Sequence, residues 1–234
     1  MDTETDSTST STGRQDTYHF SITPTNVPRI DTKYRKIVTA IPPESSIPIL
    51  NELRKYEPAS MSLELPVVWD RAEDFQVFDE SGNCWIDFCA GTFVTNAGHR
   101  NPKICNAISE IVNNNFLHNY YFPSKIRAKL VKKLHDMTAV NLDKVFLLTT
   151  GAETTECCIK LARIYGRKIN PKKIGIVSFV GAMHGKTLGA LMVGGKTKEK
   201  YWIANHDPDM HHLPFPKESS DDEVFHNHMK QLEQ

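Results

Sequence analysis

Two continuous apolar runs, separated by a helix-forming segment, constrain the fold more than any other part of this 234-residue chain. The first run is Val145 to Leu148 and the second is Ile174 to Phe179. Neither shows the strict alternation that is typical of a half-exposed strand. Strands that are apolar on both faces occur in sheets covered by helices on both sides. The order strand, helix, strand therefore predicts an α/β domain with parallel strands.

A short polar turn, Thr149-Thr150-Gly151-Ala152, joins the first run to the helix and predicts an anion site. The first backbone N–H groups of a helix have no partner within it, and the helix dipole adds partial positive charge there. Phosphate suits such a turn best, and the hydroxyls of Thr149 and Thr150 can contact it too. The glycine spacings of Walker A and dinucleotide-binding loops are absent, which favours a smaller phosphorylated ligand. An ordinary βα connection is the alternative for the turn considered alone.

Composition narrows the classes of function. The formal net charge is zero, which gives no support to binding of nucleic acid or of a membrane surface. No apolar run approaches the roughly 20 residues that span a bilayer. Residues 1–28 begin as an acidic, Ser/Thr-rich stretch without the features of a targeting segment, and we expect a disordered tail there. The five cysteines form no Cys-x-x-Cys pair, which predicts reduced thiols and a cytoplasmic location.

Helix and strand patterns predict the elements that precede the first apolar run. A short helix is expected at 46–55, and three short strands are expected at 67–70, 75–79 and 84–88. Two amphipathic helices are expected, at 101–116 and after Ser124, each with one apolar face directed inward. The inward residues are Ile104, Ala107, Ile108 and Ile111 in the former, and Ile126, Leu130, Val131 and Leu134 in the latter.

Five segments, in order along the chain, resemble motifs of the class III pyridoxal-phosphate aminotransferases. Phe78 to Phe88 is similar to the family's D-x-x-G-N-x-Y-x-D-F strands, and Asn96 to Pro102 to its N-x-G-H-x-x-P turn. Thr150 to Arg163 resembles the phosphate loop and helix, S-G-A-E-A-x-E-x-A-x-K-L-A-R. Phe179 to Thr187 resembles F-x-G-x-F-H-G-R-T, and His212 to Pro216 resembles the later P-F-P. The resemblance rests on the ordered set, since no single motif would suffice.

The resemblance implies an α/β fold of the fold-type-I pyridoxal-phosphate transferases, incomplete in this chain. Residues 29–95 would form an N-terminal small-domain segment with a short helix and β-strands. Residues 96–216 would form the first part of the large cofactor-binding domain, with its parallel or mixed sheet, and residues 217–234 a polar C-terminal helix or tail. Within the helix that follows the Thr149–Ala152 turn, Glu156 and Lys160 are spaced to pair at i and i+4.

The resemblance also assigns the anion site to a cofactor, pyridoxal 5′-phosphate. Gly151 and Ala152 would supply backbone N–H groups to its phosphate, and Thr150 keeps the hydroxyl of the family's serine. Met183 stands where the family has an aromatic residue that stacks on the cofactor ring, and a thioether can cover a ring face through dispersion. His184 would lie beside the ring, or it would only hold the turn through hydrogen bonds, and both interpretations stay open.

The family's chemistry moves an amino group from an amino acid or amine to a 2-oxo acid or aldehyde. It needs a Schiff-base lysine and an acidic partner for the pyridinium nitrogen, which both follow the P-F-P segment in the family. The sequence ends at Gln234, so we expect no catalytic residue in it and no activity from this chain alone. The missing C-terminal half would come from a second subunit or from an uninterrupted version of the gene. The expected partner is another copy of the chain, in a homo-oligomer, or that second chain. A truncated remnant that serves as a dimerisation or partner module is the alternative.

A metal site is a third hypothesis, based on histidines near the C-terminus. His211 and His212 are adjacent in a segment between prolines, and His206, His226 and His228 lie nearby in sequence. The segment lacks cysteine ligands and the H-E-x-x-H spacing of zinc enzymes, so a solvated loop without metal is expected.

Overall fold

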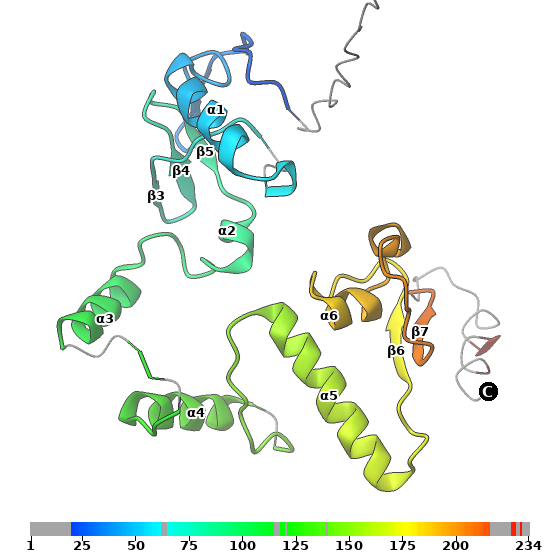
Figure 1. Cartoon of the computed structure of the whole chain (residues 1–234). Coiled ribbons are helices and arrows are strands. Elements are labelled where there is room, and N and C mark those ends of the chain that lie inside the picture. Colours follow the sequence, from blue (N-terminus) through cyan, green and yellow to red (C-terminus); the bar gives the residue numbers. More distant parts are fainter. Residues whose placement is uncertain are drawn as a thin grey trace, which may run out of the picture. The chain divides into compact units, whose positions relative to one another are not determined.

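The computed structural model describes residues 20–61, 65–114, 118–119, 121–138, 140–215, 226, 227 and 230. Its contacts divide the chain into two units, residues 1–122 and 123–234 (Figure 1). Most of the predicted tails, 1–28 and 217–234, lies outside the described residues, and the predicted boundaries at 28, 95 and 216 stay predictions. None of the helices in the described ranges combines the length and apolar character that crossing a membrane requires.

A five-stranded antiparallel sheet forms the centre of the first unit. Its strands lie in the order β1 (Ile30–Asp31), β2 (Lys36–Ile37), β5 (Cys84–Ile86), β4 (Gln76–Phe78) and β3 (Arg71–Glu73). Strands β4 and β5 confirm two of the three predicted strands. The prediction of a strand at 67–70 is wrong, because the hairpin with β4 pairs Arg71 with Phe78 and so places β3 after Asp70.

The first helix of this unit follows from its sequence. The 3₁₀ turn η1 (Glu44–Ser46) leads into α1 (Ile47–Tyr56), with Pro48 in its first turn as predicted. Proline is tolerated there because the first N–H groups of a helix have no partner within it. Leu50 is buried on its inner face, and the 3₁₀ turn η2 (Ala59–Met61) follows the helix.

A turn in the left-handed conformation, α2 (Ala90–Phe93), follows the sheet. All four of its residues have positive φ angles, although three of them are not glycine. The carboxylate of Asp87 holds this turn by accepting the backbone N–H groups of Cys89, Ala90 and Gly91 at 2.9, 3.0 and 3.2 Å. It also accepts the Cys89 thiol at 2.9 Å. These bonds offset the strain of left-handed residues that carry a Cβ atom.

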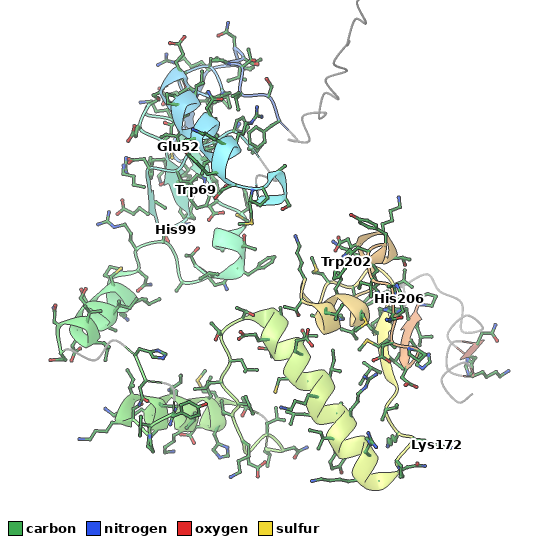
Figure 2. The ribbon with its side chains drawn as sticks, viewed as in Figure 1. Glu52, Trp69, His99, Lys172, Trp202 and His206 are labelled. Atoms are coloured by element: carbon green, nitrogen blue, oxygen red, sulfur yellow. The ribbon has the colours of Figure 1, made fainter. Side chains whose placement is uncertain are left out.

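His99 completes the support of this turn. Its Nε2 lies 2.7 Å from Oδ2 of Asp87, whose side chain is only 2% exposed. The ring of Trp69 packs edge-on against His99, with centroids 5.8 Å apart (Figure 2). Burial by itself raises the pKa of Asp87, but hydrogen bonds from Cys89, His99 and the backbone outweigh it and lower the pKa to about 2. Asp87 is therefore ionised at neutral pH, and His99 is the donor.

The two amphipathic helices are present, but their apolar faces are not covered. Helix α3 (Pro102–Asn113) begins at Pro102, near the predicted start, and α4 (Lys125–Met137) is capped by Ser124, whose Oγ accepts the N–H of Arg127 at 3.3 Å. The prediction that both faces point inward is wrong for this structure. Neither helix has a buried residue, and Ile108 is 59% exposed.

A parallel strand pair with a long helix forms the second unit. Helix α5 (Gly151–Ile169) precedes β6 (Ile176–Phe179), and β6 pairs in parallel with β7 (Met210–Leu213), as Figure 1 shows. Helix α6 (Leu188–Val193) and the 3₁₀ turn η3 (Thr197–Lys200) lie between the two strands in sequence. The parallel pairing confirms the predicted α/β class.

The first apolar run does not form the predicted buried strand. Val145 to Leu148 belongs to no helix or strand of the described residues, and Phe146 is 68% exposed. A strand forms only through hydrogen bonds to a neighbour, so an apolar run alone is not sufficient. Sequence analysis also missed β7, because its four residues, Met-His-His-Leu, carry no strand pattern.

Candidate functional site

The N-terminus of α5 is built by two side chains that satisfy its outer backbone groups. Thr150 is the N-cap, with φ −136° and ψ 163°, and its Oγ1 accepts the N–H of Glu153 at 3.2 Å. The carboxylate of Glu153 in turn accepts the N–H of Thr149 at 2.9 Å. This reciprocal arrangement resembles a capping box and fixes the direction in which the helix end points.

The remaining donors at this helix end suit a phosphate. As part of the first turn, Gly151 and Ala152 have no acceptor for their N–H groups within the helix. A Cβ atom at Gly151 would meet nothing within 4 Å, so no described part of the chain covers this helix end. The Thr150 hydroxyl uses its oxygen for Glu153 and keeps its own hydrogen to donate. The predicted residues Thr150, Gly151 and Ala152 thus fit a phosphate in number and kind of donor.

A glycine turn brings the second predicted segment to the same helix end. Gly185 has a φ of +124°, and a Cβ atom there would lie 2.7 Å from the Cβ of Ala152. Only glycine allows this approach without a shift of the backbone. The turn that carries Met183 and His184 therefore lies against the start of α5.

Met183 and His184 differ in how they are held. Met183 is 50% exposed, so its thioether is accessible from outside the turn. His184 hydrogen-bonds to Ser178 on β6, with Nε2 and Oγ 3.1 Å apart. The interpretation in which His184 holds the turn requires a hydrogen bond of this kind. The placement of both side chains beside a cofactor ring stays a prediction.

Glu156 is a residue of the site that sequence analysis assigned wrongly. Its carboxylate does not pair with Lys160, as the spacing predicted, but bonds to the start of α6. Oε1 accepts the hydroxyl of Thr187 at 2.6 Å and the N–H groups of Gly189 and Ala190 at 2.9 and 3.1 Å. A possible signal was the lack of any acidic residue in the first turn of α6 itself.

The buried lysine of this unit is used structurally. Lys200 is 7% exposed, and its Nζ donates to the carbonyl of Met192 at 2.8 Å near the end of α6. Burial lowers its pKa. Nε2 of His212 lies 3.2 Å from the same amine and 2.9 Å from the carbonyl oxygen of Gly194. Lys200 and His212 thus hold the C-terminal end of α6.

Two histidines of the metal-site hypothesis do not lie in the solvated loop that was expected for them. His211 and His212 belong to β7 rather than to a solvated loop, and neighbouring residues of a strand point to opposite faces. His228 lies outside the described residues. In the part of the chain that is described, no three His, Cys, Asp or Glu side chains gather as a metal site would require.

A hollow of about 420 Å³ lies beside this site, between α5 and β6. Apolar side chains such as Ile159, Ile176 and Phe179 form most of its wall, and His184 lies at its edge. Neither Met183 nor any residue of the Thr150–Ala152 turn lines it. The hollow is therefore separate from the predicted phosphate donors, which lie at the helix end.

Comparison with known proteins identifies the family. The model of the class III aminotransferases matches residues 58–234. An acetylornithine aminotransferase from Agrobacterium fabrum is 37% identical over 134 residues, which cover 57% of this chain and 33% of that protein. The chain therefore belongs to the class III aminotransferase family, whose cofactor is pyridoxal phosphate.

Solved structures agree with this assignment. A thermostable (S)-enantioselective ω-transaminase from Thermomicrobium roseum has a TM-score of 0.65 and 27% identity, over 79% of this chain and 41% of that one. A taurine:2-oxoglutarate aminotransferase from Bifidobacterium kashiwanohense, in complex with PLP and glutamate, has a TM-score of 0.66 and 23% identity, over 80% and 43%. The fold is thus part of a fold-type-I transaminase. The chain spans a third to about two fifths of the length of these three proteins.

Proposed function

We propose that this chain supplies the phosphate-binding part of a pyridoxal-phosphate-dependent aminotransferase. The whole protein would move an amino group from an amino acid or amine to a 2-oxo acid or aldehyde. The observation that carries this proposal is the close approach of Gly185 to Ala152, which brings the segment after Met183 and His184 to the α5 N-terminus. Family membership supports the cofactor, and the donor set at Thr150–Ala152 supports its phosphate.

Each residue has a defined part in this proposal. The N–H groups of Gly151 and Ala152 and the hydroxyl of Thr150 bind the phosphate dianion, aided by the α5 dipole. Met183 covers a face of the ring, and His184 lies at its side while Ser178 fixes the imidazole. Pyridoxal phosphate, when bound, supplies the electron sink on which amino transfer depends. The side chains of this chain bind and orient it.

The Schiff-base lysine is proposed to come from residues beyond the 234 of this sequence. Lys200 donates to the carbonyl oxygen of Met192 and lies beside His212, and Lys186 lies in the turn after His184. The missing residues would belong to a longer form of the chain or to a second chain. The exposed apolar faces of α3 and α4 support a polypeptide partner, either in a homodimer or in a complex with that second chain. The five free cysteines support the cytoplasm as its location.

A matched pair of substitutions at Gly151 tests the phosphate site. Gly151→Pro removes one N–H donor, yet proline is favoured at the first helical position and Thr150 already has the extended conformation that precedes proline. Gly151→Ala keeps the donor and fills open space. Pyridoxine 5′-phosphate is the probe, because it has no aldehyde to react with surface lysines. We expect about tenfold weaker binding for Gly151→Pro and no change for Gly151→Ala. Equal affinities for the two variants would contradict the site.

Three further measurements test the remaining parts of the proposal. Pyridoxal phosphate followed by borohydride and peptide mapping should trap no specific lysine in this chain, and a stable adduct at one lysine would overturn the assignment of the lysine elsewhere. Light scattering of the purified chain should show a dimer or larger species, whereas a monomer at all concentrations would reject the homodimer. Fractionation of cells tests the cytoplasmic location.

A further inference from the structure

We propose that Glu156 is a positioning residue for the cofactor ring, acting through the turn that carries Met183 and His184. The inference rests on the proposed function, because it concerns the same site. Glu156 lies in the second turn of α5, and Figure 1 shows α6 beside this end of the helix. Its role follows from three contacts made by one oxygen atom.

Oε1 of Glu156 takes the place of a local helix cap. Thr187 is the N-cap of α6, but its side chain makes no capping hydrogen bond within its own helix. Instead, Oε1 accepts the Thr187 hydroxyl at 2.6 Å and the N–H groups of Gly189 and Ala190 at 2.9 and 3.1 Å. A carboxylate at a helix N-terminus is also favoured by the helix dipole. Three donors that would otherwise lack partners are thus satisfied from a helix 31–34 residues earlier in the chain.

Two glycines show how closely the segment lies on α5. A Cβ atom at Gly185 would contact Ala152, and one at Gly189 would collide with Oε2 of Glu156. The stretch 185–189 therefore rests on the first two turns of α5, with Glu156 as its polar attachment. Met183 and His184 immediately precede this stretch, so a shift of Thr187 relative to α5 would move them as well.

The other attachments of the turn run to β6 and to the loop after α6. Ser178 holds His184, and the backbone of Gly195 bonds to Gly181 and Ala182 at 3.1 and 2.8 Å. These contacts fix the turn to β6 and to the loop after α6. Among the described residues, only Glu156 links the stretch after His184 to α5 through side-chain hydrogen bonds. Helix α5 also carries the proposed phosphate donors. Glu156 thus sets the distance between the phosphate end and the ring end of the site.

The test separates the two ends of the cofactor with two probes. Pyridoxine 5′-phosphate reports both ends, and inorganic phosphate, measured as a competitor, reports only the helix end. We expect Glu156→Ala to weaken the affinity for pyridoxine 5′-phosphate about tenfold and to leave the affinity for inorganic phosphate unchanged. Gly151→Pro should weaken both affinities. Glu156→Gln, which keeps the accepting oxygen, should restore the ring affinity to within about threefold. Lys160→Ala, on the exposed surface of the same helix, is the control.

Hydrogen exchange supplies the readout that does not depend on ligand. In the full chain without cofactor, Glu156→Ala should speed exchange at Gly189 and Ala190, while Lys160→Ala should not. If exchange rises and ring affinity stays the same, Glu156 is structural only and the positioning role is overturned. An equal loss of affinity for both probes would also overturn the positioning role. If the wild-type chain binds neither probe, the proposed function fails, and the role of Glu156 toward the ring fails with it. Hydrogen exchange would still report whether Glu156 attaches α6 to α5.

If Glu156→Ala does not fold, Thr187→Val is the alternative variant. It removes one of the three donors and is expected to show the same pattern with a smaller effect.

Discussion

Asp87 in the first unit and Glu156 in the second both hold a turn by accepting backbone N–H groups, yet they differ in reach. The N–H donors of Asp87 lie two to four residues further along the chain. Those of Glu156 lie 33 and 34 residues further along. The turn at Asp87 can therefore form locally, whereas the turn at Gly185 takes shape only when α6 packs on α5. The loop that follows Met183 and His184 therefore depends on tertiary structure.

The two carboxylates also use their oxygens differently. Asp87 uses both, because Oδ1 accepts from Cys89 and Ala90 while Oδ2 accepts from Gly91 and His99. Glu156 uses Oε1 for all three of its donors. The first arrangement requires two acceptors and the second requires one. This difference predicts that replacing the carboxylate with an amide has a small effect at Glu156 and a larger one at Asp87.

The largest effect is expected when the Asp87 carboxylate is removed. Asp87→Ala leaves several N–H donors and the His99 ring without their acceptor, while Ala90, Thr92 and Phe93 keep their strained angles. We expect the free energy of unfolding of the first unit to fall by about 3 kcal/mol. Urea unfolding followed by Trp69 and Trp85 fluorescence, in a chain with Trp202→Phe, measures it. Asp31→Ala, at an exposed carboxylate, should change it by less than about 0.5 kcal/mol.

Gly185→Ala should have the next largest effect, and on the second unit. Alanine at a φ of +124° is strained, and its Cβ would press on Ala152. We expect a loss of about 2 kcal/mol in the free energy of opening of α6, measured by native-state hydrogen exchange. Gly151→Ala adds the same methyl group where nothing lies within 4 Å, and it should be neutral or slightly stabilising. Similar losses in both variants would show that the close approach of Gly185 is not important.

Acid should weaken the first turn in a defined range of pH. The pKa of Asp87 falls from 3.8 to about 2 on folding, so its carboxylate contributes stability that is present above about pH 4. This contribution is lost as the pH falls from about 4 to about 2, and it amounts to about 2 kcal/mol. The stability difference between the wild type and Asp87→Asn, which cannot titrate there, should shrink by that amount. A difference that stays constant down to pH 2.5 would contradict the lowered pKa.

The features predicted correctly from sequence are those whose cause lies within a few residues. Pro48 marks the start of α1, Ser124 caps α4, and the polar turn before Gly151 marks the start of α5. Caps and first-turn prolines act on neighbouring backbone groups, so the local sequence contains their whole cause. The donor set of the candidate phosphate site could be predicted for the same reason.

The features that were missed depend on residues far away in sequence. Val145 to Leu148 has the composition of a strand, but a strand needs a neighbour, and none of the described strands pairs with it. Glu156 had a suitable local partner in Lys160, and only the packing of α6 shows that its oxygen bonds elsewhere. Arg163 and Asp207, 44 residues apart, form an ion pair at 2.7 Å that no pattern indicated. Long-range partners compete with local ones, and one sequence does not show which of them wins.

The smallest expected effect gives the sharpest test of the comparison. Glu156→Gln keeps an oxygen where all three donors converge and places its amide nitrogen at the position of Oε2, which accepts no hydrogen bond from a described residue. We therefore expect the free energy of opening of α6 to change by less than about 0.5 kcal/mol. The same change at Asp87 points an amide N–H₂ group at the Gly91 N–H, so Asp87→Asn should destabilise its turn clearly. Native-state hydrogen exchange measures the free energy of opening of both units in each of the two variants. If both substitutions lower the free energy of opening by the same amount, the charge of the carboxylate matters in both turns. The number of accepting oxygens would then not distinguish the two turns.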